Sequence, residues 1–189
     1  MKDRIIIEQK PELEYLKETM PKEDIAEVDG LCPKRQREIL GCRSIVYRAL
    51  GKKRLLHDSF GAPILEQGNL HISISHSSTM LAVALSPSPC GIDIEDKNRN
   101  FSRIITKYLS HREIELLQKI TDGFAIAWCT KEALYKYQRT LKLNYINDIH
   151  IDGIEESNRL LHCSILDKRD ILARYDYYGN CISAVIFER

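Results

Sequence analysis

Two carboxylates lie two residues apart in the segment Gly91-Ile92-Asp93-Ile94-Glu95. Its alternation of apolar and acidic residues predicts a short strand, in which side chains two apart share a face. Asp93 and Glu95 would then be held about 6–7 Å apart on a rigid element. Such a pair suits Mg²⁺, which takes oxygen ligands and shares them with a substrate phosphate. The pattern is equally typical of a half-buried strand with an ordinary polar face, so both interpretations stay open.

A second candidate segment combines a glutamate with two lysines: Trp128-Cys129-Thr130-Lys131-Glu132-Ala133-Leu134-Tyr135-Lys136. On a helix, Glu132 and Lys136 are four residues apart and share a face. They form either a stabilising pair worth roughly 0.2–0.5 kcal/mol or an oxygen ligand beside a cationic partner for a phosphate. Lys131 is adjacent to this face and is a further candidate for binding an anion.

A third candidate segment is Ser73-Ile74-Ser75-His76-Ser77. A histidine flanked by serines at a strand end can donate hydrogen bonds to a phosphate. The alternative is a turn formed by serines, with the histidine satisfied locally. A Ser-His-Asp hydrolase is disfavoured, because the chain has no Gly-x-Ser-x-Gly elbow and adjacent Ser75 and His76 would face opposite sides of a strand.

The composition is that of a soluble globular protein: 189 residues, of which 43% are hydrophobic and 29% charged. The formal net charge of +1 provides no global field toward nucleic acid or a membrane. Residues 1–10 do not resemble a signal peptide, and no apolar run reaches membrane-spanning length. The six cysteines include no Cys-x-x-Cys pair, so we expect them to be reduced and buried. We therefore expect a cytoplasmic protein without a nucleic-acid or membrane partner.

The elements that must position these segments divide at Ser86-Pro87-Ser88-Pro89, the best candidate boundary. Before it, the pattern predicts a strand over 4–9, helices over 11–19 and 32–50, a loop over 57–68, and a hairpin of strands over 69–76 and 80–85. Gly51 stands where a helix C-terminal cap belongs. The other side of the 32–50 helix is basic, with Lys34, Arg35, Arg37, Arg43 and Arg48.

After the boundary, the acidic strand precedes helical segments over 101–109, 110–120 and 124–139. Ser110 and Glu113 form the capping box that begins the second of these helices. Strands are predicted over 145–151, 159–166, 171–177 and 181–187, with turns at Gly153 and Gly179-Asn180. This order favours an α+β fold of two halves of similar size.

In this order, the three candidate segments resemble the motifs of phosphopantetheinyl transferases of the larger, surfactin-synthetase-activator type. That family has Gly-[Ile/Val]-Asp-x-Glu, then Trp-x-x-Lys-Glu-[Ala/Ser]-x-x-Lys, with Ser-His upstream. This chain has Gly91 to Glu95, Trp128 to Lys136, and Ser75-His76. The likeness covers roughly residues 34 to 150, and the tryptophan-to-lysine motif is its most specific part.

The resemblance implies a pseudo-dimer of two similar α+β halves with the active site in the cleft between them. Residues 1–88 would form the coenzyme A-binding half and residues 89–189 the metal-binding, catalytic half. The implied reaction moves the 4'-phosphopantetheine arm of coenzyme A to a serine of an apo acyl or peptidyl carrier protein, with Mg²⁺. We expect a monomer, because both halves lie in one chain.

The resemblance also implies roles for individual residues. Asp93, Glu95 and Glu132 would hold Mg²⁺, which neutralises charge on the transferred phosphoryl group. Glu132 would also be the base for the serine hydroxyl, and Lys136 would stabilise or protonate the leaving phosphate. The residues expected to hold the phosphates of coenzyme A are Arg37, Arg43, Ser75, His76, Lys131 and Lys136.

The chain departs from the family in three places. Ala62 replaces the lysine of a Gly-Lys-Pro turn, His57 corresponds to an expected arginine, and Gln138-Arg139-Thr140 replaces glycines after the Trp-Lys-Glu helix. Two alternatives stay open: a non-catalytic module that binds carrier proteins or coenzyme A, which the missing turn lysine favours, and an unrelated Mg²⁺ phosphohydrolase built on the same carboxylates. In a transferase, a local basic surface should meet the acidic helix of the carrier, and its candidates are Lys97, Arg99, Arg103 and Lys107.

Overall fold

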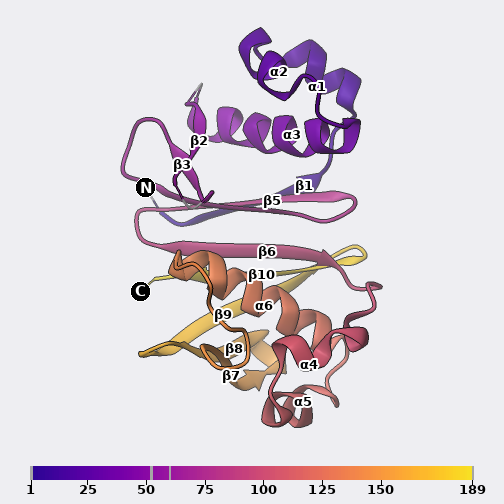
Figure 1. Ribbon diagram of the computed structural model, residues 1–189, viewed down its shortest axis with the longest axis vertical. Coiled ribbons are helices and arrows are strands. Elements are labelled where there is room, and N and C mark those ends of the chain that lie inside the picture. The colour runs from indigo at the N-terminus through magenta and orange to yellow at the C-terminus, as the bar shows by residue number, and fades with distance from the viewer. Residues whose placement is uncertain (1, 52, 60, 189) are drawn as a thin grey trace.

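The computed structural model describes residues 2–51, 53–59 and 61–188, which form antiparallel sheets covered by helices (Figure 1). This mixed architecture is compatible with the predicted α+β class. The elements before the proline boundary are β1 (Arg4–Gln9), α1 (Leu13–Thr19), α2 (Lys22–Val28), α3 (Pro33–Leu50), β2 (Leu55–His57), β3 (Pro63–Leu65), β4 (His71–His76) and β5 (Met80–Ser86). Those after it are β6 (Cys90–Asp96), η1 (Phe101–Arg103), α4 (Ile105–Tyr108), α5 (His111–Leu117), α6 (Gly123–Gln138), β7 (Ile149–Glu155), η2 (Glu156–Asn158), β8 (Leu160–Ile165), β9 (Lys168–Tyr178) and β10 (Cys181–Phe187).

The first sheet has the strand order β1-β5-β4, with both pairs antiparallel. Helix α3 lies along one face of this sheet (Figure 1). Its apolar residues Ile45 and Val46 pack against Ile72 and Leu85 of the strands. Gly51 follows the helix at a φ of 76°, which confirms the predicted C-terminal cap.

The second sheet has the strand order β6-β10-β9-β8-β7, and α6 packs on it. Ile126, Ala127 and Leu134 of the helix share a buried cluster with Ile182 and Ala184 of β10. The helix is buried over most of its circumference, because the sheet, α5 and the segment after α6 all pack against it. This burial fixes which of its polar side chains can reach the surface.

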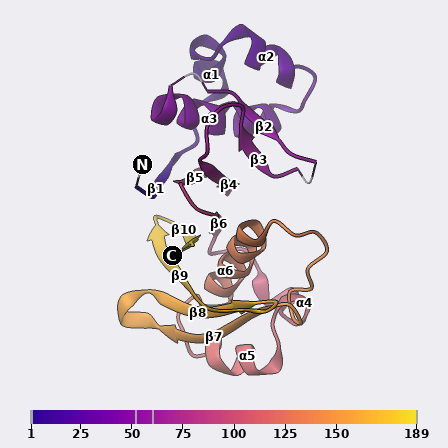
Figure 2. The same cartoon turned by 90° about the vertical axis from the view of Figure 1, so that its left-hand side faces the viewer.

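A third apolar layer lies between the two sheets. Ala82 and Ala84 of β5 pack there against Ile92 and Ile94 of β6 and Val185 of β10. Figure 2 shows β6 between the upper body and the lower one, directly after β5 in the chain. The residues before and after the prolines therefore meet through a shared core, while their equivalence as pseudo-dimer halves and the domain limits 1–88 and 89–189 stay predictions.

Several predicted boundaries were wrong. The segment 57–68 was predicted as a loop, but His57 and Pro63 end the pairing of β2 with β3 in a short hairpin. Helix α2 was not predicted, because its charged residues show little periodicity. The strand predicted from Tyr145 begins only at Ile149, since Asn144 Oδ1 accepts hydrogen bonds from the backbone of two following residues and forms a turn.

Gly153 was predicted to be a turn, and that prediction was also wrong. It lies inside β7, at a register shift opposite β8. The capping box of Ser110 and Glu113 is confirmed, and so is the turn at Gly179 between β9 and β10. Cys32 is exposed, whereas the other cysteines are buried as expected. Among the described residues, every helix is too short or too polar to span a membrane.

Candidate active site

Gly91 lets helix α6 approach strand β6 unusually closely. A Cβ atom at this position would lie 2.0 Å from the carbonyl oxygen of Ala133 and 2.8 Å from the backbone nitrogen of Tyr137. Any side chain would therefore push the helix away from the strand. The glycine of the acidic segment is thus the residue that brings Asp93 within reach of α6.

Asp93 is the point at which three segments meet. Its Oδ1 accepts a hydrogen bond from Ser75 Oγ of β4 at 2.6 Å and an ion pair from Lys136 Nζ of α6 at 2.7 Å. Lys136 also donates to the carbonyl oxygen of Ile92 at 3.1 Å. Asp93 is 4% exposed, and its Oδ2 is buried without a hydrogen-bond partner among the described residues. A buried carboxylate oxygen without a partner is costly, and it marks the place where a cation or a donor is missing.

Glu95 is held by the aromatic residue of the second segment. Trp128 Nε1 donates to Glu95 Oε1 at 3.2 Å, and Arg99 Nη1 pairs with the same oxygen at 2.5 Å. The Arg99 guanidinium also lies 5.2 Å from the centre of the Trp128 ring. Burial raises the pKa of Glu95, and the neighbouring charge of Asp93 raises it further.

Glu132 lies on the face of α6 that points to the same region. Tyr145 donates its hydroxyl to Glu132 Oε1 at 2.7 Å. Burial raises the pKa of Glu132, the Tyr145 hydrogen bond opposes that rise, and the charge of Asp93 adds to it. The Asp93 carboxylate therefore lies near enough to Glu95 and Glu132 to disfavour the ionisation of both glutamates.

The three carboxylates are not arranged as a finished metal site. In the described part of the chain, no group of three or more histidine, cysteine, aspartate or glutamate side chains is placed to hold a metal ion. Each carboxylate instead accepts a hydrogen bond from a neighbouring side chain: Asp93 from Lys136, Glu95 from Arg99, and Glu132 from Tyr145. The donor chemistry nevertheless fits Mg²⁺, because oxygen ligands that repel one another and an unpartnered Asp93 Oδ2 would both gain from a cation.

Lys136 borders two neighbouring pockets. One, of about 330 Å³, is lined by Ser75, His76 and Arg35 among others. The other, of about 250 Å³, lies against Tyr135 and Arg139. Gly61 and Pro63 also line both pockets, and we call the two pockets together the groove.

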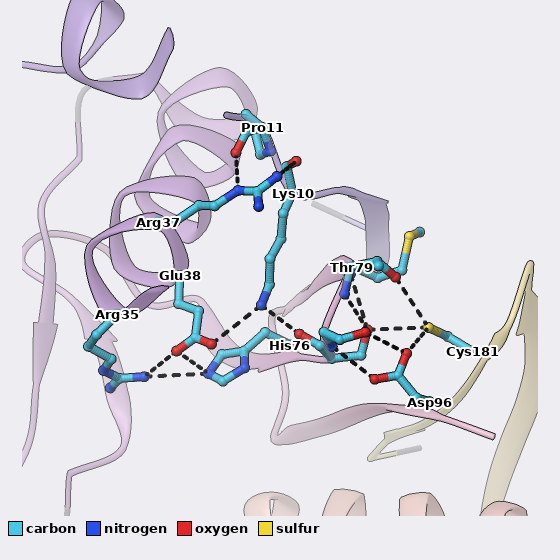
Figure 3. A network of polar contacts seen from close by, with 12 residues as sticks. Lys10, Pro11, Arg35, Arg37, Glu38, His76, Thr79, Asp96 and Cys181 are labelled. Carbon is cyan, nitrogen blue, oxygen red and sulfur yellow. Dashed lines mark hydrogen bonds and ion pairs between the residues drawn. The ribbon is translucent and has the colours of Figure 1, made fainter. Parts of the chain in front are cut away.

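A buried glutamate organises the cationic wall of the larger pocket (Figure 3). Glu38 lies 3.4 Å from Lys10 Nζ, 3.2 Å from Arg35 Nη1 and 3.4 Å from His76 Nε2. Burial alone would raise the pKa of Glu38, but these three groups lower it below its ordinary value. Burial lowers the pKa of His76. The wall therefore carries Glu38 beside Arg35 and His76, and the buried Lys10, which does not line the pocket, also pairs with Glu38. This balance of charge suits an anionic ligand.

Residues 89–179 match the 4'-phosphopantetheinyl transferase superfamily. The matched stretch begins at the proline boundary and contains Asp93, Glu95, Glu132 and Lys136, so it includes the carboxylates and the lysine just described. The match supports the resemblance at the level of the superfamily and suggests phosphopantetheine transfer as the general activity. No curated protein matches the chain.

The structure does not bring all of the expected phosphate ligands to the groove. Arg37 turns toward the backbone, where it donates to the carbonyl oxygens of Pro11 at 2.5 Å and Lys10 at 2.8 Å (Figure 3). Arg43 lines the larger pocket, yet its guanidinium pairs with Asp24 at 2.7 Å and with Glu27 at 2.5 Å. Both acidic partners of Arg43 lie in α2, and the sequence did not predict them because it did not predict that helix.

Lys131 lies away from the groove, although it neighbours Glu132 in the chain. Consecutive helical residues point about 100° apart, and this rotation turns Lys131 into the core. Its side chain is fully buried and pairs with Glu113 at 2.7 Å. The structure therefore places Lys131 in a buried ion pair, away from the groove in which it was expected to bind a phosphate.

Sequence reasoning missed two residues of the site. Arg139 has a φ of 53° and donates from Nη2 to the carbonyl oxygens of Ile72 at 2.9 Å and Pro63 at 3.3 Å, which ties the end of α6 to the groove wall. Tyr145 was placed in a strand. The aromatic spacing of Trp128 and Tyr135, seven residues apart on one helix face, was the available signal for a ring between them.

Proposed function

We propose that the protein is a Mg²⁺-dependent phosphopantetheinyl transferase of the surfactin-synthetase-activator type, acting as a holo-carrier-protein synthase. The observation that carries this proposal is that Ser75 and Lys136 both contact the Asp93 carboxylate. Asp93 and Lys136 lie in the segment that matches the superfamily, and Ser75 joins them from upstream of it. The transferred group would be the 4'-phosphopantetheine arm of coenzyme A, and the acceptor a serine of an apo carrier protein.

The larger pocket is the proposed place for the phosphates of coenzyme A. His76 and Arg35 line it, and Ser75 provides a hydroxyl at its edge. The His76 and Arg35 side chains can donate hydrogen bonds to phosphate oxygens, and charge-assisted bonds of this kind are the stronger ones. The Ser75 hydroxyl already donates to Asp93 and would hold that carboxylate beside the phosphates. Arg43 would contribute a weaker field, because two carboxylates already share its guanidinium.

The proposed transfer forms one bond and breaks one. The carrier serine oxygen attacks the phosphorus that bears the pantetheine arm, the bond from that phosphorus to the bridging oxygen breaks, and adenosine bisphosphate leaves. Glu132 takes the serine proton, a role that suits a carboxylate whose pKa is raised by burial. Lys136 stabilises the charge on the leaving phosphate. Mg²⁺ held by Asp93, Glu95 and Glu132 would supply charge neutralisation and alignment of the phosphates.

The carrier is proposed to dock on the basic segment after β6. Arg103 and Lys107 are exposed there, whereas Arg99 pairs with Glu95 and lies over Trp128. Exposed cations change the rate of encounter with an acidic partner more than they change the chemical step. Reversal of charge in Arg103→Glu should therefore raise the KM for the carrier, and an unchanged KM would count against this surface.

A mass measurement tests the proposed reaction. The protein is incubated with Mg²⁺, coenzyme A and a panel of apo carrier proteins, and one carrier should gain the mass of the phosphopantetheine arm. Asp93→Ala and Glu132→Ala should abolish the gain, whereas Glu115→Ala, an exposed glutamate on α5, should not. Turnover retained in both site variants would refute the assignment of the carboxylates.

The second candidate is a module that binds coenzyme A or carrier proteins without transfer. The ion pair between Lys136 and Asp93 favours this module, since Lys136 already contacts an oxygen of Asp93 that would otherwise be free to bind a metal ion. Ala62 favours it as well, because the turn lacks the cationic side chain of the family. Calorimetric titration separates the two candidates: binding without any mass gain on every carrier of the panel supports the module.

A further inference from the structure

One aromatic ring from outside helix α6 is inserted between two rings of that helix. The Tyr145 ring stacks on Trp128 with 6.0 Å between centroids and an interplanar angle of 1°, and on Tyr135 with 5.7 Å and 2°. Trp128 and Tyr135 are seven residues apart, which corresponds to about 10.5 Å along a helix axis. A single ring fills that space, so the stack leaves Tyr145 little freedom to rotate or slide.

The backbone of Tyr145 is fixed as well. Lys131 Nζ donates to its carbonyl oxygen at 2.7 Å and to that of Ile149 at 2.7 Å. The same ammonium pairs with Glu113 inside the core. Tyr145 is therefore held at its ring by α6 and at its backbone by a buried lysine of the same helix.

The tip of this immobilised ring reaches one group of the site. Glu132 lies between Trp128 and Tyr135 on the helix face, and its Oε1 accepts the Tyr145 hydroxyl at 2.7 Å. Stacking needs only the ring, and phenylalanine would supply it equally well. The hydroxyl adds a single directed bond, and that bond fixes the orientation of a carboxylate that the side-chain torsions of glutamate would otherwise leave variable.

We propose that Tyr145 is a positioning residue that holds the Glu132 carboxylate in its working orientation, and that Lys131 sets the place of Tyr145. This inference rests on the proposed function of Glu132 as a base and metal ligand. It also gives Lys131 an indirect role, which is to fix the backbone of Tyr145 and not to bind a phosphate as the sequence led us to expect. Tyr145 contacts Glu132 and not the groove, so its loss should change turnover and metal affinity rather than the binding of coenzyme A.

The test compares Tyr145→Phe with Tyr137→Phe. Tyr137 is a residue of α6, whereas Tyr145 packs against that helix. Tyr137 also donates its hydroxyl to a glutamate, Glu188, at 3.1 Å, so the control loses the same kind of bond where no site role is proposed. Tyr145→Phe should lower kcat about tenfold, the loss expected when a hydrogen bond to a charged group is removed, with a KM for coenzyme A within about twofold of the wild type. Tyr137→Phe should leave both constants unchanged.

A second readout does not depend on turnover. Binding of Mn²⁺ in the presence of coenzyme A, measured by electron paramagnetic resonance, should weaken several-fold in Tyr145→Phe and not in Tyr137→Phe. In a Glu132→Ala background, Tyr145→Phe should have no further effect on Mn²⁺ binding, because the two residues act as one unit. A wild type that binds Mn²⁺ but transfers nothing refutes the proposed function and leaves this comparison intact. Equal Mn²⁺ affinity of wild type and Tyr145→Phe, or the same loss with and without Glu132, would overturn the positioning role.

Discussion

Helix α6 carries two lysine–carboxylate pairs with the same separation and opposite surroundings. Lys131 pairs with Glu113 at 2.7 Å, and Lys136 pairs with Asp93 at 2.7 Å. The first pair is sealed, with side chains 0% and 3% exposed, whereas Lys136 is 28% exposed and borders the groove. Distance alone therefore does not separate a structural pair from a functional one.

The two pairs differ in how completely their polar atoms are used. Lys131 donates to Glu113 and to two backbone carbonyl oxygens, and Glu113 also accepts from the backbone nitrogens of Ser110 and Ile151. Asp93, in contrast, keeps a buried oxygen without a partner. A saturated pair has nothing left to offer a ligand, whereas an incomplete one has a cost that a ligand can remove. This difference indicates a structural role for Lys131 and supports the proposed chemical role of Lys136.

The largest effect is expected at the sealed pair. Lys131→Met should lower the free energy of unfolding by about 3–5 kcal/mol, because it leaves Glu113 charged and buried without its cation. Urea denaturation at pH 7 measures this change. The double variant Lys131→Met, Glu113→Gln should recover much of the loss, since a neutral amide needs no counter-charge. A single variant within about 1 kcal/mol of the wild type would contradict the structural assignment.

A smaller stability effect and a larger activity effect are expected at the open pair. Lys136→Met should lower stability by about 1–2 kcal/mol, between the values for exposed and fully buried pairs. Transfer to a carrier should fall about 100-fold, because a cation aimed at the leaving phosphate is lost. Lys119→Met, an exposed lysine after α5, is the control for loss of charge. If Lys136→Met destabilised the protein as much as Lys131→Met, the contrast between the two pairs would fail.

The predictable part of the fold was the part governed by local alternation. The β4–β5 hairpin, the acidic strand β6 and the capping box of α5 follow from patterns of two to four residues. Gly153 shows the limit, since a glycine predicts a turn and a bulge equally well, and only the pairing of β7 with β8 decides between them. The order of the strands in the larger sheet depends on long-range packing that no local pattern contains.

The site was predictable where charged residues stand in a specific motif, since few structural roles explain such a motif. Asp93 and Lys136 were identified from their segments and their resemblance, and the structure joins them. Arg37 and Arg43 were expected to hold phosphates because they share a basic helix face, but that pattern cannot show which partners neutralise them. The carboxylates of Glu12 and Asp24 do so, and both come from the segment before α3, where sequence signals were weakest.

The smallest expected effect concerns His76, which shares a feature with each of the two pairs. It contacts Glu38, a buried carboxylate that is also paired with Lys10 and Arg35, and it lines the open groove. Burial lowers its pKa in the folded protein below the ordinary value of 6.5. The unfolded chain therefore takes up a proton first as the pH falls, so stability is fully present above about pH 6.5 and declines below it.

Between pH 7.5 and 5.5 this decline should be at most about 1 kcal/mol, because His76 is partly exposed to solvent screening. His76→Gln should make the urea midpoint less dependent on pH in this window, whereas His111→Gln, at an exposed position on α5, should not. The half-buried His71 acts in the same direction, since burial lowers its pKa too. Glu95 and Glu132 act in the opposite direction, because the folded protein raises their pKa values and takes up their protons first as the pH falls. Glu38 titrates below its own ordinary value of 4.5, outside the window. A wild-type slope retained in full by His76→Gln would contradict the assignment of this pH dependence to the burial of His76.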